Sequence, residues 1–252
     1  MPVTIVGNNT PTAGGVVYGD GTNYASTAAG TAGQVLQSNG SSAPSWVTVT
    51  SGSLLRITVF TTSGTWNKGA GTNFFKVYGV GGGASGGGPR TSTTSGAGGG
   101  GAGGYFQKFA STSGISTATV TIGAGGAVQS SANSDGNAGG TTTFAYGATT
   151  LTGNGGAGGV ANISGGGGGN GGSASNGDLN ISGQAGMGGS YPAGTTGFPG
   201  SGGNSMLGFG GPSNAAQGVQ AATGYGSGGT GASGGSAGGA GAAGVVIVEE
   251  YA

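Results

Sequence analysis

A stretch dominated by glycine, from Gly79 to Gly244, constrains this chain more than any other feature. Twelve of the 71 glycines precede Gly79 and none follows Gly244, so 59 lie within the stretch, in runs such as GGGASGGGP, GAGGGGAGGY and GGGGGNGG. Glycine loses more backbone freedom on folding than other residues, so such a stretch tends to be a flexible linker. An ordered form therefore has to rely on backbone contacts, because few side chains are available to pack.

One ordered arrangement open to such runs is a bundle of polyglycine-II-type helices. Chains of this geometry turn once every three residues, rise ~3.1 Å per residue and make no internal hydrogen bonds. Without Cβ atoms they can lie side by side and exchange N–H···O=C bonds, which satisfies buried backbone groups. Collagen is excluded because glycine has no strict period and there are only 7 prolines. A packed bundle and a disordered linker remain, and the aromatic residues between the runs favour the bundle.

The charge and the missing residue types exclude several classes of function. Only 4% of residues are charged, five basic against five acidic, which argues against a partner with a phosphate backbone or an anionic membrane. The chain has no cysteine and no histidine, the commonest general base and metal ligand. No run approaches the ~18 apolar residues of a membrane span. We therefore expect no enzyme, cofactor, metal site, nucleic-acid partner or membrane insertion.

Short motifs add no catalytic site. G-x-G-x-x-G recurs, as the glycine content makes inevitable, and G-x-S-x-G around Ser85 and Ser233 cannot form a Ser-His-Asp triad without histidine. Asp135 and Asp178 each adjoin a glycine and are interpreted as turn residues. The N-terminus MPVTIVGNNTPT lacks the features of a signal peptide. The expected protein is soluble and is not exported by that route.

Strand patterns predict an all-β fold with two domains. In the run 54–80, Phe75 and Val77 alternate with polar and aromatic neighbours, which is typical of strands with one buried face. Similar patterns predict strands within 104–151 and 244–252, with Glu249 and Glu250 reaching solvent. We expect a small β-sandwich over 53–252, whose glycine-rich connections, about 81–103 and 152–243, pack as a cap with no strand pattern in 152–243.

Residues 1–52 read as a separate, small polar module. Short strands are bounded by a Gly-Asp-Gly turn at 19–21 and an Asn-Gly turn at 39–40, a pair that tolerates positive φ. Such a module is too small for a core of its own. The whole chain is also short of large apolar side chains, so oligomerisation is the expected source of additional stability.

Several blocks between the glycine runs carry a resemblance to a known family. TTSGTWNKGAGTNFFKVYGVGGGASGGG is followed by GGGGAGGYFQKF, ATVTIGAGGA, NAGGTTTF, GDLNISGQAG and GGAGAAGVVIVEEYA. In this order they resemble the glycine-rich domain of bacteriophage tail-fibre and receptor-binding adhesin proteins. The segment YASTAAGTAGQVLQSNGSSAPSW is similar to segments found upstream in phage fibres. Together these blocks are spread over residues 24–252.

The resemblance implies a virion structural protein on the particle surface. It implies an intertwined homotrimer that contacts a bacterial surface receptor, protein or glycan. The N-terminal module would dock to tail or capsid proteins, and its candidate docking residues are Val3, Ile5, Val16 and Tyr18. Two alternatives stay open: a capsid-decorating head fibre without a receptor role, and a cellular glycine-rich structural protein.

The candidate receptor-contact residues are large apolar side chains within the glycine-rich stretch. They are Tyr191, Phe198, Met206, Phe209 and Tyr225, with Leu207 beside them. Aromatic side chains combine rigid contact area with a low loss of entropy, which suits an exposed binding patch. The alternative interpretation is that they wedge between glycine tracts or between subunits and lock the bundle.

Overall fold

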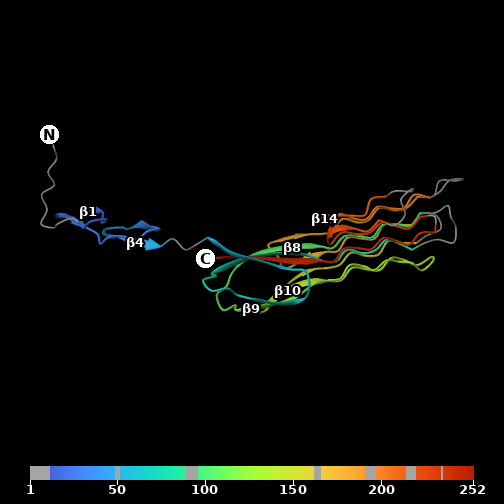
Figure 1. The fold of residues 1–252 in the computed structure, drawn as a ribbon, viewed down its shortest axis with the longest axis horizontal. Helices are drawn as coiled ribbons and strands as arrows, with labels where there is room; N and C mark the ends of the chain where they lie inside the picture. Colours follow the sequence, from blue (N-terminus) through green and yellow to red (C-terminus); the bar gives the residue numbers. More distant parts are fainter. Residues whose placement is uncertain are drawn as a thin grey trace, which may run out of the picture. The chain divides into compact units, whose positions relative to one another are not determined.

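The chain divides into two units, Met1–Ser53 and Leu54–Ala252, close to the boundary expected at residue 52 (Figure 1). This computed structural model describes residues 12–48, 52–88, 96–161, 166–190, 197–213, 220–233 and 235–252. Every regular element within these ranges is a β-strand, which confirms the all-β prediction.

The first unit consists of two antiparallel strand pairs. β1 (Val17–Gly19) pairs with β2 (Tyr24–Ser26), and β3 (Gln34–Asn39) pairs with β4 (Ser42–Thr48). The second turn falls at Gly40 and Ser41, where Gly40 takes the positive φ of 70° that the Asn-Gly signal predicts. The Trp46 indole lies against Gly30 and donates from Nε1 to the Ala28 carbonyl at 2.9 Å.

The second unit contains two five-stranded antiparallel sheets. The β16 sheet has the order β13-β8-β7-β16-β5, and the β10 sheet has the order β12-β11-β10-β9-β6. In the first, the strands are β5 (Leu54–Phe60), β7 (Phe74–Val80), β8 (Tyr105–Ser111), β13 (Leu179–Ile181) and β16 (Val245–Tyr251). In the second they are β6 (Gly64–Asn67), β9 (Thr117–Thr121), β10 (Thr142–Tyr146), β11 (Thr149–Gly153) and β12 (Ala174–Ser175).

The two sheets share an aromatic core. Trp66 and Phe144 of the β10 sheet contact Phe75 of the β16 sheet, with ring centroids 5.4 Å and 5.7 Å from that of Phe75. Val77, Phe106 and further apolar residues of both sheets complete one buried cluster. The predicted alternation in 74–80 is confirmed, since Phe75 and Val77 are fully buried. Their burial is what holds the two layers together.

The region 152–243 contains more strand than predicted. β12, β13, β14 (Leu207–Phe209) and β15 (Thr223–Tyr225) all lie in it. Each has only two or three residues, which is too short for an alternating pattern to be visible in the sequence. Their pairing is set by partners distant in the chain, as when β13 pairs with β8.

The glycine-rich connections leave the sheets at one end, run outward together and return (Figure 1). Each connection has an outgoing and a returning tract, linked in sequence to the strands before and after it. The main pairs of tracts are 81–88 with 96–104, 123–129 with 134–140, 154–161 with 166–173, 182–190 with 198–204, and 226–232 with 237–244. The tracts are therefore loops of the sandwich that pack against one another.

Hydrogen bonds between tracts repeat every three residues. In tract 81–88, successive N–H groups donate in rotation to tracts 96–104, 134–140 and 237–244. The bonds to the first of these join Gly81 to Gly104, Ala84 to Gly101, and Gly87 to Gly98, all at 2.9 Å. A period of three is the turn repeat of polyproline-II-type chains, which have no internal hydrogen bonds and so direct every N–H at a neighbour.

Two tracts, 81–88 and 96–104, lie at the centre of this lattice. The tract 96–104 donates to 154–161, 182–190 and 226–232, and it accepts from 81–88, 166–173 and 198–204. The approach is so close that a Cβ atom on Gly98 would lie 1.9 Å from the Gly167 carbonyl oxygen. Backbone pairing of this kind requires glycine there and stabilises the lattice without an apolar interior.

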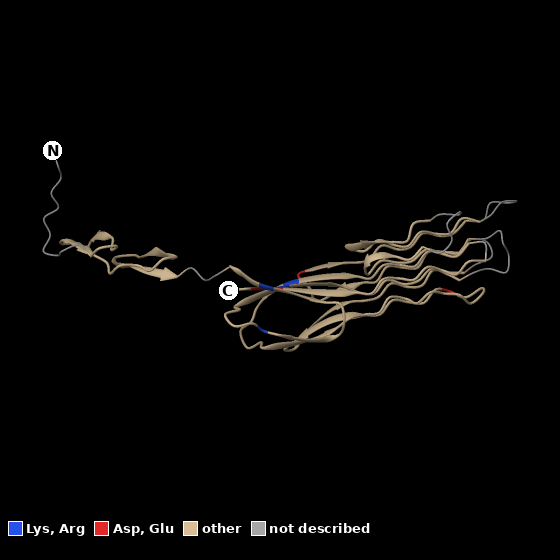
Figure 2. Ribbon diagram, viewed as in Figure 1, with Lys and Arg blue, Asp and Glu red and all other residues tan. Residues whose placement is uncertain are grey.

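Charged residues are sparse and cluster mainly on the β16 sheet (Figure 2). Glu250 is the clearest departure from the sequence prediction, because its side chain is fully buried rather than solvated. Its carboxylate pairs with Arg56 and accepts hydrogen bonds from Gly69 N–H at 2.7 Å and Thr72 Oγ1 at 3.1 Å. Burial alone would raise the pKa of Glu250, but the bonds from Arg56, Gly69 and Thr72 outweigh it and lower the pKa below its ordinary value.

Glu249 is also held by the protein, with a side chain 17% exposed. It accepts hydrogen bonds from Tyr78 Oη at 3.2 Å and Tyr251 Oη at 2.7 Å, and Lys76 Nζ lies 3.8 Å away. The prediction of a solvated strand end was wrong because β16 pairs on both sides, with β7 and β5. A strand near the end of the chain can lie at the edge of a sheet or inside it, and the sequence pattern does not distinguish these two positions.

Candidate functional site

Three of the candidate receptor-contact residues come together on the β14–β15 strand pair. Leu207 pairs with Tyr225 and Phe209 with Thr223, while Met206 immediately precedes β14. A further connection begins and ends at this strand pair, since residues 210–213 and 220–222 follow β14 and precede β15 in the sequence. Sequence alone placed these residues in one region, and the strand pairing brings Tyr225 beside β14, which holds Phe209 and follows Met206.

Hydroxyl groups fix the backbone of this strand pair. Ser205 Oγ donates to the Tyr225 carbonyl and accepts from the Leu207 N–H at 3.0 Å, and the Ser205 N–H donates to the Gly208 carbonyl at 3.0 Å. Gly224 pairs with Gly208 and has a φ of 81°, and a Cβ on Gly224 would lie 2.7 Å from Gly208 Cα. The two glycines permit this close approach, which holds the neighbouring side chains in place.

The side chains on this pair are exposed. Phe209 is 74% exposed, Met206 54% and Tyr225 39%, whereas Leu207 is half-buried. A shallow depression of about 530 Å³ is lined by residues of both strands, among them Met206, Leu207, Phe209 and Thr223. An exposed apolar group on a fixed backbone can contact a partner without first being ordered, so it loses little entropy on binding. We call the three exposed residues Met206, Phe209 and Tyr225 the β14–β15 patch.

The other two candidates do not belong to this patch. Phe198 is 52% exposed and begins the returning tract 198–204, where its carbonyl accepts a hydrogen bond from the Ser190 N–H at 2.9 Å. Eight residues separate it from Met206, a span of ~25 Å at ~3.1 Å per residue. Tyr191 lies outside the described residues. Phe198 and Phe209 are more than half exposed, whereas Tyr225 is 39% exposed, and wedging between tracts or between subunits stays an alternative prediction.

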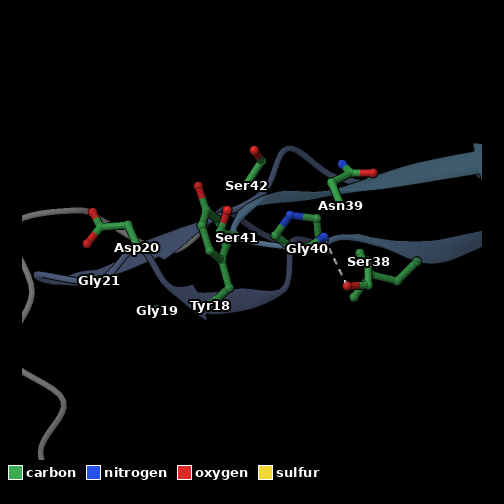
Figure 3. A pocket seen from close by; sticks show the side chains of 11 residues that line it. Tyr18, Gly19, Asp20, Gly21, Ser38, Asn39, Gly40, Ser41 and Ser42 are labelled. Atoms are coloured by element: carbon green, nitrogen blue, oxygen red, sulfur yellow. Dashed lines mark hydrogen bonds between the residues drawn. The ribbon is translucent and has the colours of Figure 1, made fainter.

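The first unit has a hollow of its own between its two strand pairs (Figure 3). Tyr18, Asp20, Leu36, Asn39 and Ser42 are among the residues around this space of about 620 Å³. The Asp20 carboxylate accepts hydrogen bonds from the Asn23 N–H at 2.6 Å and the Thr22 N–H at 2.8 Å, which lower its pKa. It therefore serves the turn between β1 and β2.

Of the candidate docking residues, Tyr18 lines this hollow and Val16 is half-buried just before β1. The Val16 N–H donates to Thr27 Oγ1 at 3.0 Å, so its backbone is tied to the strand pair. Val3 and Ile5 lie outside the described residues. The structure thus brings one candidate docking residue to a surface hollow.

The acidic residues of the glycine-rich stretch have structural partners. Asp178, just before β13, pairs with Lys108 and accepts from the Phe109 N–H at 2.9 Å, and the bonds from Lys108 and Phe109 lower its pKa. Asp135 accepts from the Ala161 N–H at 2.9 Å, joining two tracts. Within the described ranges, no three His, Cys, Asp or Glu residues gather as a metal site would require, and no helix could cross a membrane.

Comparison with known proteins identifies a family. No curated protein matches the chain. The sequence pattern of a family described as "Glycine-rich domain" matches residues 58–251, which include the sandwich and its tracts apart from the first residues of β5. Because this match covers most of the chain, the protein belongs to the glycine-rich domain family.

Proposed function

We propose that this protein is a bacteriophage virion structural protein, a tail-fibre or adhesin subunit that contacts the host cell surface. The ordered blocks that resemble phage fibre domains support this proposal, and membership of the glycine-rich domain family agrees with it. The proposed protein is non-enzymatic and acts as a homotrimer on the particle. Its first unit docks to other virion proteins, with the hollow around Tyr18 as the candidate surface.

The observation that carries the receptor role is the β14–β15 patch. It presents three large apolar side chains on two strands. Their backbone is fixed by the hydrogen bonds of Ser205 and by the close pairing of Gly208 with Gly224. The partner is a bacterial surface protein or glycan with an apolar or ring face. The formal net charge of zero means that contact area, rather than long-range attraction, provides the binding energy.

The test is adsorption of particles that carry the double variant Phe209→Ala/Tyr225→Ala. Removing two exposed anchors of a binding patch costs about 1–2 kcal/mol each, so we expect the adsorption rate constant to fall at least about tenfold. The melting temperature should stay within about one degree of the unmodified protein, because neither side chain belongs to the buried core cluster.

A second variant, Met206→Ala, removes the remaining side chain of the patch. Its matched control is Met187→Ala. Both methionines are exposed, 54% and 63%, but Met187 lies on tract 182–190 away from the patch. Equal adsorption of the double variant and the unmodified particle would remove the patch from the proposal, and a fall in melting temperature would assign it to locking the bundle. Immunogold labelling on head vertices, or only on uninfected cell envelopes, would favour the two alternative functions.

A further inference from the structure

The two outer faces of the sandwich have opposite chemistry. On the β10 sheet, Thr117, Thr119 and Thr121 of β9 are exposed and alternate with the buried Ala118 and Val120. Threonine is favoured in strands and presents a hydroxyl to water. This face is therefore suited to solvent and needs no partner to cover it. The outer face of the β16 sheet is built differently, and this difference indicates that it has a partner.

Strand register gathers large apolar side chains on that face. Ile57 pairs with Glu249 and Val59 with Ile247, so these residues share the face turned away from the core. Across β7 and β8 the same face continues through Lys76 and Phe109. Its exposed large apolar residues, each 37–55% exposed, are Leu54, Ile57, Val59, Phe74, Phe109 and Leu179. We call this surface the outer β16 face.

The polar groups of the outer β16 face are already satisfied. Glu249 accepts from Tyr78 and Tyr251 and lies near Lys76, so the one acid and the one base are beside each other. Phe74 and Phe109 stack with centroids 5.6 Å apart and planes inclined by 9°. The face therefore offers no excess charge for a nucleic acid, an anionic lipid or a charged peptide.

The apolar area is large enough for a stable interface. With roughly 200 Å² for a large apolar side chain and about half of it exposed, six such residues present on the order of 600 Å². This is the upper end of the largest patch on an ordinary monomer. Together with the tyrosines and the Lys76–Glu249 pair it approaches the roughly 800 Å² per partner of a standard interface.

We infer that the outer β16 face packs against copies of the same chain. A face with balanced charge and a broad apolar surface meets no like-charge excess when it packs on itself around a symmetry axis. Copies of the chain are also present at high local concentration wherever the protein is assembled. The inference assigns a surface to the self-association in the proposed function, and its test is independent of adsorption.

The test measures the mass of the full-length protein by sedimentation equilibrium over a range of concentrations. Val59→Lys is the chosen variant because Val59 is 53% exposed and pairs with the uncharged Ile247, so no carboxylate lies directly opposite the new charge. Bringing unpaired charges into the interface should weaken association at least about 100-fold. Thr119→Lys is the matched control, an exposed strand position on the other outer face, and should associate like the unmodified chain.

Leu179→Lys provides a second variant at the opposite edge of the same sheet, on β13. A near-UV circular dichroism spectrum equal to that of the unmodified chain shows that either variant is folded. Dissociation of both variants with the control unaffected supports the inference. A monomeric unmodified chain at about 100 μM, a concentration far above the Kd of a standard interface, would overturn it, and so would equal dissociation of the Thr119→Lys control.

Discussion

A single methyl group at the centre of the glycine lattice should destabilise the second unit severely. In Gly98→Ala the new Cβ would lie 1.9 Å from the Gly167 carbonyl oxygen, and ordinary contact begins at 3.4 Å. The two tracts must therefore separate by about 1.5 Å, the difference between these two distances. The bond from Gly169 N–H to the Gly99 carbonyl, now 2.9 Å, and the neighbouring bond from Gly166 to Gly96 cannot survive that shift.

The expected loss follows from these bonds and from the overpacking. Two buried backbone pairs left unsatisfied cost about 1–3 kcal/mol each, and forcing a group into a filled space adds about 1–3 kcal/mol. We expect the free energy of unfolding to fall by about 3–9 kcal/mol. The sign is informative, because alanine in place of glycine otherwise stabilises a protein by restricting its unfolded chain.

Gly167→Ala is the matched control on the facing tract. Gly167 is exposed, and a Cβ there would meet only Val160 Cγ2, at 4.0 Å. This variant should gain about 0.4–1 kcal/mol. Urea unfolding of the Trp46→Phe background at one fixed protein concentration, followed by the fluorescence of the buried Trp66, measures both values. If Gly98→Ala unfolds at the same urea concentration as Gly167→Ala or a higher one, the close-packed lattice argued above is wrong.

Two further predictions concern Glu250 and the first unit. Because the pKa of Glu250 is lowered in the folded protein, its contribution to stability is complete above its ordinary pKa of 4.5 and is lost as pH falls through the folded-state value. Glu250→Gln should lower the free energy of unfolding at pH 7 by about 2 kcal/mol and flatten this acid dependence, and parallel pH profiles would contradict the assignment. Deleting residues 1–53 should leave the melting temperature of the second unit unchanged, since its buried core cluster is built from that unit's own residues, and should prevent incorporation into particles. Incorporation of the shortened chain would refute the docking role.

The local patterns of the sequence predicted the sandwich well and its surfaces poorly. Alternation identified Phe75 and Val77 as core, because burial on one face of a strand repeats every second residue. The same strands hold a second apolar set, visible in LLRITVF and FFKVYGV, that forms the outer β16 face. Two apolar sets on one strand are the sequence signal that indicates such a face. The burial of Glu250 could not be read from the local sequence pattern, because its partners Arg56 and Thr72 are far away in the chain.

Two features of the second unit follow from the amino-acid sequence: its strands, and the dependence of its glycine runs on backbone pairing. Both are local consequences of side-chain period and of missing Cβ atoms. Three other features depend on long-range contacts: the six tracts around 96–104, the pairing of β14 with β15, and the burial of Glu250. Glycine runs lack side chains that would distinguish one from another, so the neighbours of each tract are set by the strands from which the tracts emerge.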